Sequence, residues 1–272
     1  MQSSPFALDG KLAVVTGGGG VLGSAMARAL ARAGARLVLI GRTRATLDAA
    51  VASIREQGGD AHALVADVLS REALATACAD VLGRFGTPSV LVHAAGGNRP
   101  GATVPPDRSV FHLDPREIDA VFALNFNGTL LPTLAFAEAM AAHGSGSIIT
   151  ISSMAASRPL TRVLGYSAAK AAVENLTRWL AVELARKHGA GLRVNAIAPG
   201  FFVTEQNRRL LLAADGTPSE RGAAVLAHTP LARFGEAGDL DGAVVWLASD
   251  ASRFVTGAVI PVDGGFGAFA GV

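Results

Sequence analysis

The sequence predicts an α/β protein built on one parallel β-sheet with helices on both of its faces. Short runs rich in Val, Leu and Ile recur along the chain, and longer segments of helical periodicity separate them. These runs are largely apolar, as in strands that are covered on both sides. Half of the 272 residues are hydrophobic and no linker or repeat divides the chain, so we expect a single domain over residues 1–272.

The elements alternate along the whole chain. We expect strands at Leu12–Thr16, Leu37–Ile40, Ala61–Ala66, Val90–His93, Ser147–Ile151 and Leu192–Ile197. The segments between them favour helices at Leu22–Ala33, Arg44–Gln57 and roughly at 70–84, 114–142 and 164–188. One of these helices has a clear start, because Asp114 can cap it, Pro115 suits its first position and Glu117 can return to the cap. Right-handed crossovers then give a doubly wound, Rossmann-type sheet of about seven strands.

Two long connections, Gly96–Leu113 and Phe201–Thr229, leave the carboxyl ends of strands. Ligands bind at that edge of open α/β sheets, and long loops there are often functional. We expect the segment around 201–229 to close over a substrate as a helical lid, with Gly216-Thr217-Pro218 as its flexible corner.

The glycine-rich segment from Thr16 to Gly23 follows the first strand directly and opens the first helix. Glycines allow a tight turn and a close approach of the backbone to a pyrophosphate, and the helix N-terminus offers unpaired N–H groups. This position favours a dinucleotide site over a plain strand-to-helix turn.

The end of the second strand bears on the choice of cofactor. An acidic residue there would bind the adenosine ribose and repel a 2′-phosphate, but this chain has Gly41 followed by Arg42 and Thr43. The missing carboxylate and the available guanidinium favour NADP(H) over NAD(H). The alternative for Arg42 is a solvated surface charge, and Arg44 is expected to face solvent.

Tyr166 and Lys170 are four residues apart on an expected helix and therefore share one face. A phenol titrates near 10, too high for acid–base work at neutral pH, and a neighbouring ammonium lowers that pKa. Tyr166 is the one tyrosine of the chain. Ser153 follows the fifth strand, where its hydroxyl can bind a substrate oxygen, and Asn125 is an amide in the middle of a helix.

These motifs resemble the short-chain dehydrogenase/reductase family over nearly the whole chain, from Gly10 to Gly265. The family places Asn, Ser, Tyr and Lys in this same order. Its glycine motif is matched at three positions, although Val21 stands where the middle glycine belongs. His93 begins a His-Ala-Ala-Gly segment where the family usually has Asn-Asn-Ala-Gly, and we interpret it as a structural histidine.

The resemblance implies the site residues and their roles. Tyr166 would give or take the proton, Lys170 would lower the tyrosine pKa and hold the nicotinamide ribose, Ser153 would orient the substrate, and Asn125 would anchor a water. Asp67 would lie near the adenine, with capping of the next helix as its alternative. The implied cofactor contacts are Gly17, Gly19, Gly20, Leu22, Gly23, Arg42, Thr43, Asp67, Val68, Ala95, Gly96, Tyr166, Lys170, Pro199, Gly200, Phe202 and Thr204.

Within the family, the chain is similar to a branch known as D-mannonate oxidoreductase or fructuronate reductase. The segments that carry this likeness are 96–100, 125–133, 157–161, 201–208 and 264–272. A six-carbon sugar acid is thereby implied, and several polar side chains suit it. The substrate candidates are Asn98, Ser153, Arg158, Gln206 and Arg208, with Arg158 or Arg208 expected at the carboxylate. The arginines could instead lie on the surface of a mobile lid, and Phe201 and Phe202 would also allow an apolar ketone or another polyol.

Other function classes are disfavoured. Ser167 and Lys170 have the Ser-x-x-Lys spacing of penicillin-recognising hydrolases, but the Ser-Asp-Asn and Lys-Thr-Gly segments are missing. A non-catalytic cofactor sensor would tend to lose the tyrosine or the lysine. The six histidines lack metal-ligand spacing, so no metal is expected.

The composition also limits the partners. A net charge of +2 argues against nucleic acid or an anionic membrane as a partner, and no stretch holds the roughly 18 uninterrupted apolar residues of a membrane span. The single cysteine, Cys78, fits a cytoplasmic protein with a small-molecule substrate. The resemblance further implies a homotetramer or a homodimer.

Overall fold

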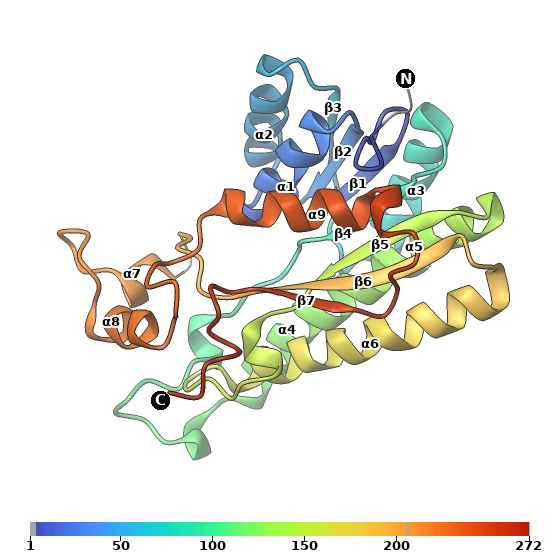
Figure 1. Cartoon of the computed structure of the whole chain (residues 1–272). Coiled ribbons are helices and arrows are strands. Elements are labelled where there is room, and N and C mark those ends of the chain that lie inside the picture. Colours follow the sequence, from blue (N-terminus) through green and yellow to red (C-terminus); the bar gives the residue numbers. More distant parts are fainter. Residues whose placement is uncertain (1–3, 206, 272) are drawn as a thin grey trace.

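The computed structural model describes residues 4–205 and 207–271. Its centre is a parallel sheet in the order β3-β2-β1-β4-β5-β6-β7 (Figure 1). The strands are β1 Leu12–Thr16, β2 Arg36–Gly41, β3 Ala61–Val65, β4 Val90–His93, β5 Gly146–Ile151, β6 Leu192–Pro199 and β7 Val259–Val262. The Rossmann-type prediction is confirmed. The strand order reverses between β1 and β4, which is where such sheets bind their ligands.

Helices cover both faces of the sheet. They are α1 Val21–Arg32, α2 Arg44–Glu56, α3 Arg71–Phe85, α4 Pro115–Phe122, α5 Gly128–His143, α6 Leu164–His188, α7 Arg208–Leu211, α8 Glu220–Ala227 and α9 Asp241–Ala248. One buried cluster joins α1, α2 and α9 to one face, and Val15 of β1 belongs to it. Its neighbour Val14 points to the other cluster, which joins α3, α5 and α6 to the opposite face.

The helix expected over 114–142 forms, but it contains a π turn at Ala123–Asn127 between α4 and α5. Asp114 caps its start as predicted, since its carboxylate accepts a hydrogen bond from the Arg116 N–H at 2.9 Å. Among the described residues, the run Pro115–His143 is the one helical stretch long and apolar enough for a membrane span, with a mean hydropathy of 1.4. Phe136 in this run is fully buried against the sheet, as in a core helix.

The segment after β6 stands apart from the sheet and carries α7 and α8 (Figure 1). The two short helices approach closely, because a Cβ on Gly222 would lie 2.1 Å from the carbonyl oxygen of Leu211. The corner between them includes Gly216, which has a φ of +85°. In Figure 1 the C-terminus lies on the same side of the sheet as these helices.

Candidate functional site

The glycine turn between β1 and α1 permits no side chains at its ends. Gly17 has a φ of +67°, and a Cβ there would lie 2.5 Å from the backbone nitrogen of Ala95. A Cβ on Gly23 would lie 2.2 Å from the carbonyl oxygen of Gly17. The backbone of the turn therefore packs directly against the backbone at the end of β4. Because no side chain intervenes, a bound anionic group could approach the N–H groups of the turn closely.

Val21 departs from the family motif without distorting this turn. Helix α1 begins at Val21, and Gly20 precedes it in an extended conformation, with its N–H donating to the Gly17 carbonyl at 2.9 Å. The Val21 side chain is 43% exposed, so it points outward from the first helical position. Leu22 packs against the core cluster, and Gly19 lies against Thr46 of α2.

Arg42, directly after β2, carries a positive charge with no carboxylate partner among the described residues. Arg42 is also exposed. Arg44 is bound to both carboxylate oxygens of Asp48 at 2.9 Å, so it faces solvent along α2, as expected. Thr43 is the N-cap residue of α2, and its carbonyl accepts the Thr46 hydroxyl.

Asp67 does not cap the helix that follows it, so that alternative is wrong. The N-cap of α3 is Ser70, whose hydroxyl accepts the Ala73 N–H. One oxygen of Asp67 accepts the Leu69 N–H at 2.9 Å and so forms a local turn. Val68 is buried and packs against Gly128 at the start of α5.

His93 is a buried structural residue at the end of β4. Its Nε2 lies 2.8 Å from the Thr133 hydroxyl, and burial lowers its pKa to about 3. The imidazole is therefore neutral at physiological pH. Ala95 and Gly96 continue the chain past it, and a Cβ on Gly96 would lie 2.8 Å from Asn125 Oδ1 and 3.2 Å from Lys170 Nζ.

Asn125 occupies the π turn and is fully buried. Its Nδ2 donates to the Gly97 carbonyl at 2.7 Å and to the Val121 carbonyl at 2.8 Å. Its Oδ1 accepts the Gly97 N–H at 3.1 Å. The amide thus ties the segment after β4 to the widened helical turn, and π turns of this kind often occur at functional sites.

Ser153, Tyr166 and Lys170 meet at the carboxyl end of β5. Ser153 follows that strand in an extended conformation, and its side chain is hydrogen-bonded to Tyr166 near the start of α6. Lys170 lies one turn further along α6 and is 4% exposed. Its ammonium donates to the Ile151 carbonyl at 2.7 Å and lies 5.6 Å from the centre of the Tyr166 ring.

The electrostatics of this group differ from the prediction. Burial raises the pKa of Tyr166 above its usual value, and the hydrogen bond with Ser153 opposes this only in part. Burial also lowers the pKa of Lys170 to about 8. Lys170 is not among the causes of the Tyr166 shift, and its ammonium donates to the Ile151 carbonyl.

Ser152 points away from this group toward a carboxylate that the sequence did not reveal. Its hydroxyl donates to Glu174 Oε1 at 2.9 Å, and Arg178 donates to Glu174 Oε2 at 3.1 Å. Glu174 lies four residues after Lys170 on α6, and this spacing was the one signal that could have indicated it. Ser153 is therefore the serine that lies at Tyr166.

The turn after β6 is built on close backbone contacts. A Cβ on Gly200, which follows Pro199, would lie 2.7 Å from Asp263 Cα. The Thr204 N–H donates to Asn207 Oδ1 at 2.8 Å, and the Thr204 hydroxyl lies 3.3 Å from the same oxygen. Asn207 in turn donates to the Phe202 carbonyl, so its side chain orders the turn rather than projecting from it.

The substrate candidates are only partly brought together. Asn98 donates to the Thr103 hydroxyl at 3.0 Å, and Arg208 is an exposed residue at the start of α7. Arg158 donates through Nε to the Gly267 carbonyl at 3.0 Å, so its guanidinium already has a partner in the chain. Gln206 lies outside the described residues.

The C-terminal segment links the catalytic loop to the segment after β6. Asp263 accepts the N–H groups of Gly265 and Gly267, and the Phe266 ring packs edge-on against Phe201 at 5.1 Å. Together with the Arg158 contact, these bonds hold residues 263–267 across the end of the sheet.

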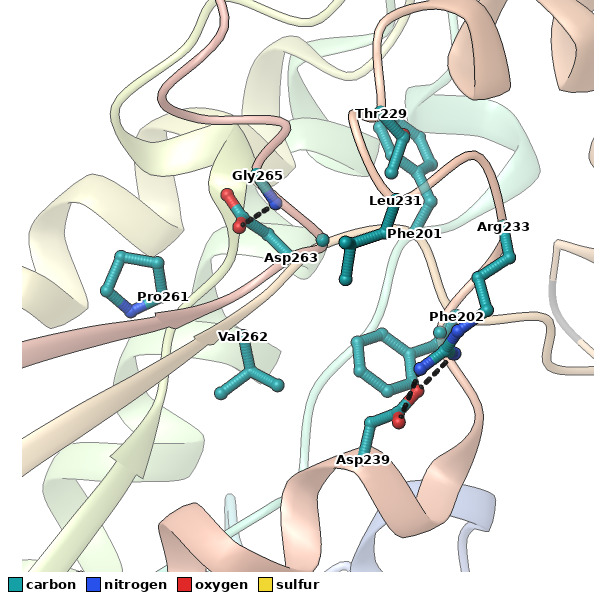
Figure 2. A pocket seen from close by; sticks show the side chains of 12 residues that line it. Phe201, Phe202, Thr229, Leu231, Arg233, Asp239, Pro261, Val262, Asp263 and Gly265 are labelled. Carbon is teal, nitrogen blue, oxygen red and sulfur yellow. Dashed lines mark hydrogen bonds and ion pairs between the residues drawn. The ribbon is translucent and has the colours of Figure 1, made fainter.

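A cavity of about 360 Å³ opens beside this segment. Figure 2 shows Arg233 paired with Asp239 next to Phe202, with Asp263 across the cavity. The residues that line it are Phe201, Phe202, Thr229, Leu231, Arg233, Gly235, Asp239, Pro261, Val262, Asp263, Gly264 and Gly265. This lining contains neither Ser153 nor Tyr166, so the cavity adjoins the candidate site without forming its catalytic part. In the described part of the chain, no three His, Cys, Asp or Glu side chains gather as metal ligands.

Known proteins are similar to this chain in sequence. A family model described as enoyl-(acyl carrier protein) reductase matches residues 20–267. The uncharacterized oxidoreductase UxuB of Bacillus subtilis (strain 168) is 47% identical over 97% of this chain and 98% of its own length. The galactitol 2-dehydrogenase (L-tagatose-forming) of Cereibacter sphaeroides is 38% identical over 96% of both chains.

Two solved structures agree closely with the fold. A protein from Haemophilus influenza, provisionally named a D-mannonate oxidoreductase and solved with bound NAD, has a TM-score of 0.92 and 42% identity over 98% of both chains. A gluconate 5-dehydrogenase from Burkholderia cenocepacia J2315, in complex with NADP and tartrate, has a TM-score of 0.87 and 33% identity over 97% of this chain and 98% of its own. The chain belongs to the short-chain dehydrogenase/reductase family, and it is an NAD(P)-dependent oxidoreductase.

Proposed function

We propose that this oxidoreductase interconverts a secondary alcohol and a ketone on a six-carbon sugar acid of the D-mannonate/D-fructuronate type. Several relatives are named as dehydrogenases of sugar acids or polyols, which supports this substrate class. The structure of one of them was solved with tartrate, a hydroxy acid. The observation that carries the proposal is the group of Ser153, Tyr166 and Lys170, in which Lys170 is buried and the other two side chains are partly buried.

Each side chain has a role that follows from its contacts. Tyr166 gives a proton to the substrate oxygen in reduction and takes it back in oxidation, and the Ser153 hydroxyl binds the same oxygen and orients it. The raised pKa of Tyr166 keeps the phenol protonated, which suits it to act as the acid in reduction. Lys170 lies 5.6 Å from the centre of the Tyr166 ring, and its pKa of about 8 lets it exchange a proton near neutral pH. Asn125 fixes the segment after β4 beside Lys170.

The residues around the site also fit a dinucleotide. The glycine turn and the N-terminus of α1 would hold the pyrophosphate, and Asp67 with Val68 would flank the adenine. Ala95, Gly96 and Lys170 would contact the nicotinamide ribose, and the turn at Pro199–Thr204 would contact the carboxamide. When bound, the nicotinamide supplies or accepts the hydride.

We further infer a preference for NADP(H). Arg42 is exposed at the end of β2, and no carboxylate stands at Gly41 to repel a 2′-phosphate. Relatives have been solved with either dinucleotide, so a direct test is needed. Arg42→Ala should lower kcat/KM for NADPH by roughly tenfold or more while that for NADH changes little. Equal losses with both cofactors would contradict the preference.

We propose that the whole chain is one NAD(P)-binding domain in which the segment around 201–229 closes on the substrate. The short helices α7 and α8 stand apart from the sheet, as a lid requires (Figure 1). We also propose a homodimer or homotetramer, since α6 exposes Trp179 and Val182, each at 58%. Light scattering of the purified chain would test this, and a monomer would contradict it.

A neutral polyol is the second candidate substrate. The galactitol 2-dehydrogenase relative favours it, as does the engagement of Arg158 by the Gly267 carbonyl. Parallel assays with D-fructuronate and with neutral ketohexoses separate the two candidates. A kcat/KM at least tenfold higher for D-fructuronate supports the sugar acid, whereas a higher value for a neutral ketose supports the polyol.

A further inference from the structure

The loop between the two catalytic positions meets the lid through an arginine. Residues 157–163 connect the turn that follows Ser153 to the helix that carries Tyr166. Arg221 of α8 donates to the Thr161 hydroxyl at 3.1 Å and lies 3.4 Å from the Thr161 carbonyl. These contacts bring a lid guanidinium against the catalytic loop.

Arg162, the next residue of that loop, has an unusual backbone. Its φ is +75°, a left-handed conformation that residues with a Cβ rarely adopt. The conformation is held by neighbouring structure, because the Arg162 carbonyl accepts the Val104 N–H at 2.9 Å. Backbone strain of this kind concentrates at functional sites and clamps.

Two positive charges are close at this junction, because Arg221 contacts Thr161, the residue before Arg162. The nearby charge of Arg162 lowers the pKa of Arg221, in addition to the larger effect of burial. Neither guanidinium forms an ion pair with a carboxylate in residues 4–205 or 207–271. Like charges that are half-buried together repel, and an anion between them would turn that repulsion into attraction.

Arg162 lies in the loop that connects the two catalytic positions, and Arg221 lies on α8 of the segment that follows β6. Arg162 precedes Tyr166 by four residues and follows Ser153 by nine, so it borders the reacting groups along the chain. Arg221 belongs to the lid that would cover them.

We propose that Arg162 and Arg221 together bind the carboxylate of the sugar-acid substrate and thereby close α8 over the site. This inference rests on the proposed function, because it assigns the acidic end of that same substrate. Each planar guanidinium can donate two parallel hydrogen bonds to a carboxylate, and the two come from the loop and from the lid. Binding of the acid would therefore draw the lid onto the loop that carries the catalytic residues.

The test compares an acid with its neutral counterpart. We would measure kcat and KM with NADPH for D-fructuronate and for D-fructose in the wild type, Arg162→Gly, Arg221→Met and Arg253→Met. Arg162→Gly removes the charge while relieving the left-handed strain, so its fold should be preserved or stabilised. Arg253 is an exposed arginine near the far end of α9 and is the matched control.

We expect the preference for D-fructuronate to fall roughly ten- to hundredfold in Arg162→Gly and Arg221→Met, mainly through KM. Values for D-fructose should stay within about twofold, and Arg253→Met should match the wild type. Equal losses with both substrates would mean that Arg221 only anchors the lid, which would overturn the inference.

Different results would overturn the proposed function and the carboxylate site. A wild type that prefers D-fructose would overturn the proposed function, and the carboxylate site with it. A wild type that prefers D-fructuronate, together with variants that keep this preference, would overturn the carboxylate site alone. Calorimetric binding of tartrate to the NADP⁺ complex gives a readout without turnover. Loss of tartrate binding in both arginine variants supports the site, and retained binding contradicts it.

Discussion

Adding one methyl group at Gly23 should disrupt the glycine turn. The Cβ of Gly23→Ala would lie 2.2 Å from the Gly17 carbonyl oxygen and 2.9 Å from its carbon. Gly17 cannot retreat, because its own Cβ position lies 2.5 Å from the Ala95 nitrogen. Overpacking costs about 1–3 kcal/mol, and we expect the upper end here because both neighbours are backbone. At roughly 2–4 °C per kcal/mol for a chain of this size, Tm should fall by about 6–12 °C.

Gly20→Ala is the matched control for the stability measurement. Its Cβ would meet only the Gly17 oxygen, at 3.3 Å, and its φ of −83° suits any residue. The unfolding free energy should change by about 1 kcal/mol or less. Thermal denaturation and NADPH fluorescence titration would measure both variants, and Gly23→Ala should also weaken NADPH binding at least tenfold. Unaltered stability and binding in Gly23→Ala would refute the close approach of the two backbones.

Three further predictions follow from the site. His93 has a pKa of about 3 when folded and about 6.5 when unfolded, so its stabilising effect is complete above pH 6.5 and is lost as the pH falls toward 3. His93→Asn should flatten the pH dependence of the unfolding free energy in that window, and identical slopes would contradict this. Asn125→Ala removes the amide that bonds three backbone groups of Gly97 and Val121. Urea titration should show that the free energy of unfolding falls by about 2–4 kcal/mol, and kcat should fall at least tenfold. Wild-type values of both would exclude the role given to the amide. Arg158→Met should speed limited proteolysis of residues 265–271 while KM for D-fructuronate changes less than about threefold. A selective tenfold rise in that KM would restore Arg158 as the carboxylate ligand.

The sequence predicted most of the sheet because strands β1, β2, β4, β5 and β6 are largely buried and therefore mostly apolar, whereas β7, which is only partly buried, was not located. It also predicted that Ser153, Tyr166 and Lys170 come together, since strand ends and helix starts of a parallel sheet share one edge. The π turn at Asn125 was not predicted, because one extra residue in a helical turn leaves hydrophobic periodicity almost unchanged.

Other features depended on tertiary contacts that no local pattern encodes. The partner of Arg158 is a backbone carbonyl 109 residues away, so the arginine looked free in the sequence. The pKa of Tyr166 rises because of burial, whereas spacing alone indicated only its neighbour Lys170. Asp67 was a plausible helix cap, but the helix begins after Ser70, whose hydroxyl does the capping.

The most direct test of the account is the oxidation of NADPH by the purified chain with D-fructuronate, followed by absorbance for the wild type and Tyr166→Phe. The variant keeps the aromatic ring and removes only the hydroxyl that is hydrogen-bonded to Ser153. We expect turnover in the wild type and a loss of about 10²- to 10⁴-fold in the variant, with NADPH still bound. A Tyr166→Phe enzyme as active as the wild type would contradict the assignment of Tyr166 as the proton donor.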